Sequence, residues 1–350
     1  MAQPTSSAPA KPPAKKQSNR SNLIAAIIIV ALLVATVLFV DVGQMIQVML
    51  HTNYALVLVG VIFLLGGIAL IDVRWWYLLG REPAFKRLGH ATNASYIVPI
   101  LTPIPNYISR VVITGMATEA TLPQATTSMM VERMIAQIMR ITTIVLTVAL
   151  GVQSTMSPAS MVRSILLSFA VLAGYLLAIR YAEQVISGVE KGVTKIPRLS
   201  DKTRGKIVSI TQEALSVDIG MKDLLFAVGM TIVMWTLFFL FHFMVILSMP
   251  LGLDMHSNIT IALGALALTP PSAPAMLGIY QISQVGPNLI LRLGSLEQLL
   301  PYSLMLYFIQ AIVWMILTVW GLRKLDMSFV DLFRSSKSQS EVVTATEETG

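Results

Sequence analysis

The sequence lacks cysteine and contains few charged residues. With no cysteine in 350 residues, the chain can form no disulfide, no zinc–thiolate site and no thiol nucleophile. Only 12% of the residues are charged, whereas a soluble domain carries about 25%. The hydrophobic content of 55% and the mean hydropathy of +0.72 indicate an integral membrane protein.

Sequence motifs of enzymes are also missing. The chain has no HExxH, no Walker loop and no GxSxG, the patterns that mark zinc proteases, nucleotide-binding loops and serine hydrolases. Acidic residues are sparse near the apolar segments, and no two of the four histidines are spaced as a metal pair. We therefore expect no enzymatic activity, no cofactor and no metal site.

Long apolar runs dominate the chain instead. A helix needs about 20 apolar residues to cross about 30 Å of hydrocarbon. A weaker run at 141–153 becomes long enough if its helix begins upstream, near Ser128. Together with the clearer runs, it predicts an all-α polytopic membrane protein with about six spanning helices. The clearer runs cover 23–40, 54–73, 164–179, 224–248 and 302–322.

The net charge of +7 is distributed unevenly. Three loops, 41–53, 154–160 and 249–258, contain no Lys or Arg. By the positive-inside rule, the basic loops and both termini are cytoplasmic, which predicts a multi-pass protein of the cell membrane. This bias accounts for the positive charge, so we expect no nucleic-acid partner. The basic residues cluster at Lys11–Arg20, Arg74–Arg87, Arg180–Lys206 and Arg323–Lys324.

The predicted organisation has three parts. Residues 1–22 form a disordered basic cytoplasmic tail that could touch anionic lipid headgroups; a solvated tail without a role is the alternative. Residues 23–325 form the transmembrane domain, which includes a cytoplasmic amphipathic segment at 181–222. Residues 326–350 form a short polar cytoplasmic tail.

Two apolar segments are interrupted by prolines. Residues 92–116 contain three prolines, and the stretch LTPPSAPAMLG at 268–278 contains three more. Proline lacks an N–H and breaks a helix. For each segment, the preceding span ends and the following span begins on the same face of the membrane. We therefore expect two re-entrant hairpins that enter the membrane from opposite faces. This pattern is compatible with an inverted repeat and points to a transporter binding site. The alternative is that the prolines kink two complete spans.

Four stretches carry a resemblance to a known family. They are RWWYLLGRE, NASYIVPILTPIPNYISR, VERMIAQIMRI and TPPSAPAMLGIYQ. In this order they resemble the membrane region of lysylphosphatidylglycerol synthases, a flippase-like family that includes stand-alone proteins without the synthase domain. The resemblance covers roughly residues 20–325. It implies a protein that moves a lipid with a polar headgroup between leaflets, and family members are associated with aminoacylated phospholipids and polyprenyl-phosphate-linked sugars.

The chain departs from the family pattern at its acidic positions. Asn106 and Tyr107 stand about where the family has Gly-Glu, Gln281 replaces a Glu, and Gln137 lies where an Asp is common. Pro274 and Gly278 match the second motif. An amide can neither carry a proton nor pair with a cation, which disfavours proton coupling and a cationic lysyl-lipid.

The resemblance implies a substrate site. The guanidinium group of arginine presents a fork of N–H donors that suits phosphate. Arg140 is a further candidate for a phosphate contact, in addition to the six residues named at the end of this paragraph. For Arg110 the alternative is an arginine that snorkels at the membrane interface. We expect Glu132 to pair with a nearby Arg, and His242 to be a neutral histidine bonded to a neighbouring helix. The expected substrate-binding residues are Asn106, Arg110, Arg133, Pro274, Gly278 and Gln281.

The sequence thus predicts a lipid flippase for an anionic phospholipid or a polyprenyl-phosphate-linked lipid. The expected partners are this membrane lipid and a separate lipid-modifying enzyme. The alternative is a membrane scaffold or accessory subunit of envelope lipid or glycan synthesis that does not itself transport, because the lost carboxylates would also fit a degenerate site.

Overall fold

The computed structural model describes residues 42–96, 98–101, 106–151, 181–194, 220–268 and 279–328, apart from isolated positions. Within these ranges the chain is helical and contains no strand. The predicted spans at 23–40 and 164–179, both tails, and the prolines of 269–278 lie outside the described residues. So do Pro103, Pro105 and most of the amphipathic segment, of which α9 (Ala182–Thr194) is described.

Within the described residues, four helices are long and apolar enough to cross a membrane. They are α3 (Tyr54–Leu78), α7 (Leu122–Gly151), α11 (Met221–Ser248) and α14 (Leu296–Lys324). These helices confirm four of the predicted spans, and each helix is longer than the apolar run that predicted it. The helix predicted to begin near Ser128 begins at Leu122 instead, because the polar residues before the apolar run continue the helix rather than forming a loop.

Local sequence sets the ends of these helices. At the start of α3, the side chain of Asn53 accepts a hydrogen bond from the Ala55 amide at 3.1 Å, as expected of an N-cap residue. After α3 the chain turns at Gly80 and Arg81, which both have positive φ. At the start of α14, the Gln298 side chain accepts a hydrogen bond from the Ser295 amide at 2.8 Å. At its end, the last turn contains Arg323 and Lys324.

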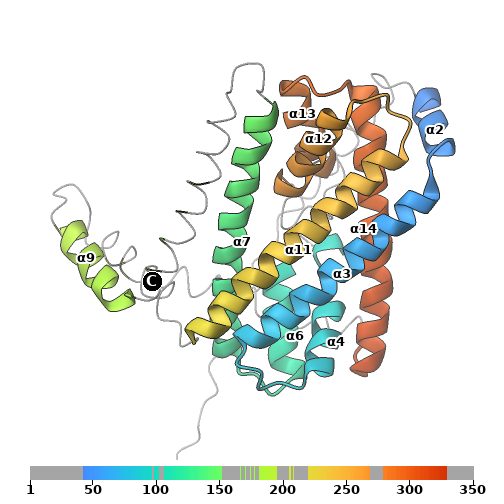
Figure 1. The fold of residues 1–350 in the computed structure, drawn as a ribbon. Helices are drawn as coiled ribbons and strands as arrows, with labels where there is room; N and C mark the ends of the chain where they lie inside the picture. The colour runs from blue at the N-terminus through green and yellow to red at the C-terminus, as the bar shows by residue number, and fades with distance from the viewer. Residues whose placement is uncertain are drawn as a thin grey trace, which may run out of the picture. The chain divides into compact units, whose positions relative to one another are not determined.

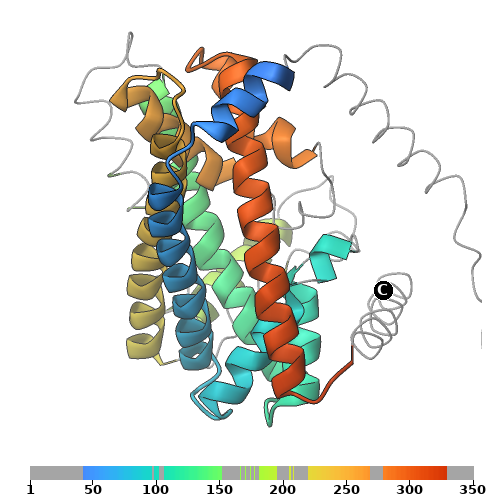
Figure 2. The same ribbon diagram turned by 90° about the vertical axis from the view of Figure 1, so that its right-hand side faces the viewer.

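Short helices occupy both ends of the bundle. The helices α4 (Phe85–Ser95), α5 (Val98–Leu101) and α6 (Asn106–Ala117) connect α3 to α7, and α12 (Met255–Leu268) and α13 (Ile279–Ile290) connect α11 to α14. Figure 1 shows α4 and α6 near one end of the long helices, and α12 and α13 near the other. The view in Figure 2 agrees. The helix α2 (Val42–Leu50) precedes α3.

The long helices run in two opposite directions. Helices α3 and α14 run toward the end that holds α4 and α6, whereas α7 and α11 start there (Figure 1). We call this the basic end, because Lys86, Arg87, Arg323 and Lys324 lie on its helices. Helices α3 and α11 pack along each other, and a Cβ at Gly60 would lie 3.3 Å from Met244 Cβ, so glycine allows the close approach.

The outer faces of the bundle are apolar. On α3, Leu58 and Ile62 are exposed, and on α14, Ile312 and Ile316 are exposed. Each pair is four residues apart and so lies on one face of its helix. Exposed apolar surface on this scale is typical of contact with lipid rather than water. The chain is therefore a multi-pass membrane protein.

Gly321 allows α14 to lie close to α4. A Cβ at Gly321 would lie 2.6 Å from the His90 carbonyl oxygen and 2.7 Å from the Ala94 amide nitrogen. Both contacts are with backbone, which cannot rotate away. The Thr318 hydroxyl, one turn earlier, donates to the Asn93 carbonyl at 3.2 Å, so the two helices are also joined by a hydrogen bond.

We predict that Gly321→Ala lowers the free energy of unfolding by about 1–3 kcal/mol, the usual cost of overpacking a close contact. Thermal unfolding of the detergent-purified protein measures this. Gly229→Ala on α11 is the matched control, because a Cβ at Gly229 meets nothing within 4 Å. Equal unfolding temperatures for the two variants would contradict the close α4–α14 contact.

Candidate functional site

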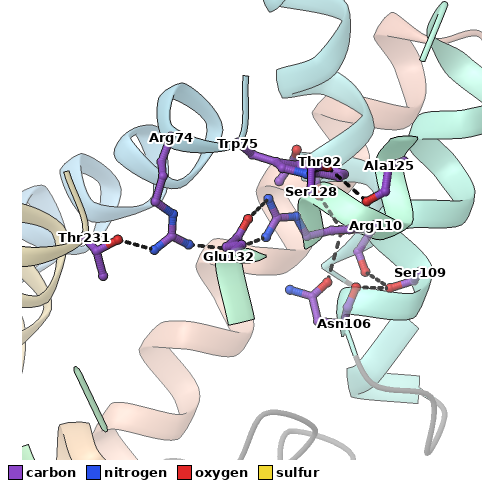
Figure 3. Close-up of polar contacts among 11 residues, drawn as sticks. Arg74, Trp75, Thr92, Asn106, Ser109, Arg110, Ala125, Ser128, Glu132 and Thr231 are labelled. Carbon is purple, nitrogen blue, oxygen red and sulfur yellow. Dashed lines mark hydrogen bonds and ion pairs between the residues drawn. The ribbon is translucent and has the colours of Figure 1, made fainter. Parts of the chain in front are cut away.

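A buried ionic network lies at the contact of α3, α6 and α7. Glu132 accepts from Arg110 through both carboxylate oxygens, at 2.9 Å and 3.3 Å. One of these oxygens also lies 2.6 Å from a terminal nitrogen of Arg74. All three side chains are at most 8% exposed. Figure 3 shows the two guanidinium groups converging on the single carboxylate.

Neighbouring side chains fix the two arginines. Arg74 donates to the Thr231 hydroxyl of α11 at 2.9 Å, so the network reaches a fourth helix. The Arg110 guanidinium lies 4.2 Å from the centre of the Trp75 ring, within the range of a cation–π contact. The Trp75 indole in turn donates to Ser128 of α7 at 3.0 Å. The result is a set of rigidly held charges (Figure 3).

The charge of Arg110 is secured by Glu132. Burial alone would lower the pKa of Arg110, but the adjacent Glu132 carboxylate and its hydrogen bonds raise the pKa above its ordinary value. Arg110 is therefore a cation paired with an anion. Its 4% exposure contradicts the alternative that it snorkels to the interface, since a snorkelling side chain keeps its charged group in water.

A cavity of about 300 Å³ opens beside this network. Its wall comes from α3, α5, α6, α7, α11, α12 and α14, and most of it is apolar or aromatic. Pockets for small ligands start at about this volume, which suits one polar headgroup rather than a whole lipid. The polar side chains that line it are Asn106, Arg110, Glu132, Arg133, Gln137, Arg140, His242 and Gln310.

One face of α7 contributes a row of these groups. Arg133, Gln137 and Arg140 are four and three residues apart, so they share one side of the helix, and all three line the cavity. The apolar span of α7 extends over Gln124–Gly151, and its midpoint is near Gln137. The two arginines therefore lie on either side of the middle of the span.

Arg133 is held by an aromatic contact. Its guanidinium carbon lies 3.4 Å from the centre of the Tyr107 ring, and Tyr107 also lines the cavity. Within the part of the chain that the structure describes, Arg133 forms no ion pair. A cation at this depth is costly unless it meets a partner or water, so Arg133 can accept an anionic group.

The structure brings together half of the predicted substrate-binding residues. Asn106, Arg110 and Arg133 line the same cavity, and the Asn106 side chain lies 3.1 Å from the Ser95 hydroxyl. Gln281 is buried on α13 but is not among the residues that line this cavity. Pro274 and Gly278 lie outside the described residues.

Two expectations about single side chains can be compared with the structure. Glu132 pairs with arginines, as predicted. The expectation that the His242 ring bonds to a neighbouring helix is wrong for its Nδ1 atom, which lies 2.7 Å from the Phe238 carbonyl on the same helix. The reason is local, since a carbonyl one turn earlier lies within reach of a histidine side chain.

Sequence reasoning missed three residues of the site. Arg74 was interpreted only as a topology marker, although it binds Glu132. Asp72 is buried on the same helix, 7% exposed, and Tyr96 lines the cavity. Arg74 and Asp72 could have been found from the sequence, because they lie two residues apart at the end of an apolar run. A charged residue in such a place needs a partner.

A comparison with known families gives one match over most of the chain. Residues 22–321 match the family described as lysylphosphatidylglycerol synthase TM region. The chain belongs to this family. The match to the lysylphosphatidylglycerol synthase TM region covers α3, α7, α11, both sets of short helices, and α14 up to Gly321. No curated protein and no solved structure matches the chain.

We predict that Glu132→Gln lowers the free energy of unfolding by about 3–5 kcal/mol, because it leaves two buried guanidinium groups without their anion. Chemical denaturation of the protein in detergent measures the change. Glu119→Gln is the matched control, since Glu119 is 62% exposed and 3.8 Å from an exposed Arg87; it should change stability by less than about 0.5 kcal/mol. A Glu132→Gln variant as stable as the control would exclude a structural role for the network.

Proposed function

We propose that this protein moves a lipid with an anionic headgroup, either an anionic phospholipid or a polyprenyl-phosphate-linked lipid, between the leaflets of the cell membrane. One observation carries the proposal: two arginines of α7, Arg133 and Arg140, line an apolar cavity near the middle of the span. A phosphate group brings the negative charge that such cations attract, and guanidinium donors fit its oxygens. Membership of the family supports the same function.

The architecture that we propose is an inverted repeat with two re-entrant hairpins. Helices α4 to α6 form the hairpin that enters from the basic end, and α12 and α13 form the hairpin that enters from the opposite end (Figure 1). The chain directions support this, since α3 and α7 flank the first hairpin as α11 and α14 flank the second, in reversed orientation. Interrupted helices of this kind surround the binding sites of several transporter folds.

The proposed topology places the basic end and both termini in the cytoplasm. Lys86, Arg87, Arg323 and Lys324 all belong to the basic end, which fits the positive-inside rule. The basic tail at 1–22 would then contact the anionic cytoplasmic leaflet. The protein would have no enzymatic activity of its own, so a separate lipid-modifying enzyme would supply or consume the lipid.

The cavity suggests how Arg110 takes part. Arg110 lines the cavity while its terminal nitrogens bind Glu132. A phosphate that enters would compete with Glu132 for this guanidinium group, whereas Arg133 offers its donors without breaking an ion pair. We therefore assign Arg133 as the primary anion contact, Arg140 as a second guanidinium on the same wall, and Arg110 as a contact made only when its ion pair rearranges.

The alternative function, a scaffold for envelope lipid or glycan synthesis, is favoured by the neutral residues Tyr107, Gln137 and Gln281 at positions where the family pattern is acidic. A scaffold needs no water-accessible path through the membrane. Access of water to the short helices therefore distinguishes the two functions.

For the arginines, we predict that the double change Arg133→Gln and Arg140→Gln lowers the affinity for phosphatidylglycerol at least about tenfold, because each charge-assisted hydrogen bond contributes roughly 1.5–3 kcal/mol. Lipid-dependent thermal stabilisation in detergent measures affinity. Lys222→Gln, at an exposed position at the start of α11, is the control and should bind like the wild type. Unchanged binding by the double variant would refute the anion site.

For water access, we predict that single cysteines at Asn106 and Gln281 react with membrane-impermeant thiol reagents from opposite sides, Asn106 from the cytoplasm and Gln281 from outside. The native chain has no cysteine, so each label reports one position. Cysteines at the exposed Glu119 and Asp254 calibrate the two sides. If both test positions stay inert while the calibration positions react, the hairpins are sealed and the scaffold function holds.

A further inference from the structure

Two residues that line the cavity each carry a neutral, buried polar atom that lacks a hydrogen-bond partner among the described residues. The two atoms are the Tyr96 hydroxyl and Nε2 of His242. Both residues line the cavity, and they are only 3% and 4% exposed. Leaving a buried polar group without a partner is unfavourable, so such atoms in residues that line a cavity point to a ligand that supplies the hydrogen bond.

The tautomer of His242 follows from its contact with the main chain. Its Nδ1 atom lies 2.7 Å from the Phe238 carbonyl oxygen. A carbonyl oxygen can only accept a hydrogen bond, so Nδ1 carries the proton. In a neutral imidazole the other nitrogen is then an acceptor. His242 therefore offers the cavity a lone pair on Nε2, suited to an O–H or N–H donor.

Tyr96 offers the complementary group. Burial raises the pKa of its phenol above the ordinary value, so the hydroxyl keeps its proton at neutral pH and can donate. The ring is stacked parallel to Trp314, with ring centres 6.0 Å apart and planes 8° apart. This ring contact fixes the direction of the hydroxyl and leaves its hydrogen-bonding capacity unused.

A single kind of ligand group satisfies both atoms. An alcohol hydroxyl can donate to His242 and accept from Tyr96, and a headgroup with two hydroxyls can serve them separately. The aromatic rings of Trp235 and Trp314 also line the cavity and can pack against the C–H groups that accompany such hydroxyls. A phosphodiester whose headgroup lacks hydroxyls has no donor for the lone pair of His242 Nε2.

We propose that Tyr96 and His242 form a neutral subsite that recognises hydroxyl groups of the headgroup, beside the anion contacts of Arg133 and Arg140. This deepens the proposed function and rests on it, since the ligand is the same anionic lipid. It narrows the substrate class to anionic lipids whose headgroup bears free hydroxyls, such as glycerol or sugar phosphodiesters.

The test uses two short-chain lipids that differ only in hydroxyls. Phosphatidylglycerol and phosphatidylethanol are both phosphodiesters with one negative charge, but only the first has headgroup hydroxyls. Their affinities for the full-length protein in detergent are measured by lipid-dependent thermal stabilisation. We expect phosphatidylglycerol to bind the wild type about tenfold more tightly, since two hydrogen bonds contribute roughly 1–3 kcal/mol together.

The variants Tyr96→Phe and His242→Phe should each reduce this preference to about threefold and leave the binding of phosphatidylethanol unchanged. Tyr280→Phe is the control for Tyr96, because Tyr280 is also a fully buried tyrosine but does not line the cavity. His51→Phe is the control for His242, because the Nδ1 atom of His51 is also bonded to a carbonyl one turn earlier, at 2.8 Å, on an exposed helix. Both controls should keep the full preference.

The outcomes separate this subsite from the anion site. Equal affinity of the wild type for the two lipids, or a full preference in both Phe variants, would refute the hydroxyl subsite while the arginine contacts stand. If the wild type binds neither lipid, the proposed function fails as well. A preference that both Phe variants weaken and both controls retain would establish the subsite.

Discussion

The arrangement of the bundle depends on one carboxylate that serves two guanidinium groups. Glu132 joins α7 to Arg74 of α3 and to Arg110 of α6, and Arg74 extends the link to Thr231 of α11. Charges in a low-dielectric interior are expensive unless they are paired and fully hydrogen-bonded. The helices therefore have little freedom to slide past one another at this level. The same network forms one side of the cavity, so the geometry of the wall is set by ion pairing rather than by apolar packing alone.

The apolar and charged parts of the site have separate roles. Apolar packing between helices is only weakly directional, and lipid tails compete with it, so it cannot by itself fix the angle of a short helix such as α6. The ion pair of Arg110 and its contact with Trp75 do this. Arg133 lies one position beyond Glu132 and faces Tyr107 instead. Adjacent residues of one helix thus provide a structural charge and a charge available to a ligand.

The sequence predicted the elements that depend on length and composition. Runs such as 54–73 and 224–248 are unmistakable because crossing a membrane needs about 20 apolar residues. Three of the six predicted substrate-binding residues line one cavity, because the resemblance placed Asn106, Arg110 and Arg133 on elements that converge. Gln281 does not line it, since a motif gives a position on a helix but not the direction of its side chain. Arg74 and Tyr96 could not be found in this way. Their roles come from contacts with distant segments, such as Thr231 and Trp314.

In the proposed transport, the spacing of the arginines on α7 would set the size of the step that a headgroup takes. Residues seven apart on a helix are separated by about 10 Å along its axis, roughly a third of the thickness of the hydrocarbon layer. Arg133 and Arg140 therefore divide the low-dielectric barrier between the two leaflets into shorter intervals. A phosphate that moves along α7 stays within reach of a counter-ion for most of the way. Translocation by this route would need only side-chain rearrangement near the middle of the membrane, and the acyl or prenyl chains could remain in lipid throughout.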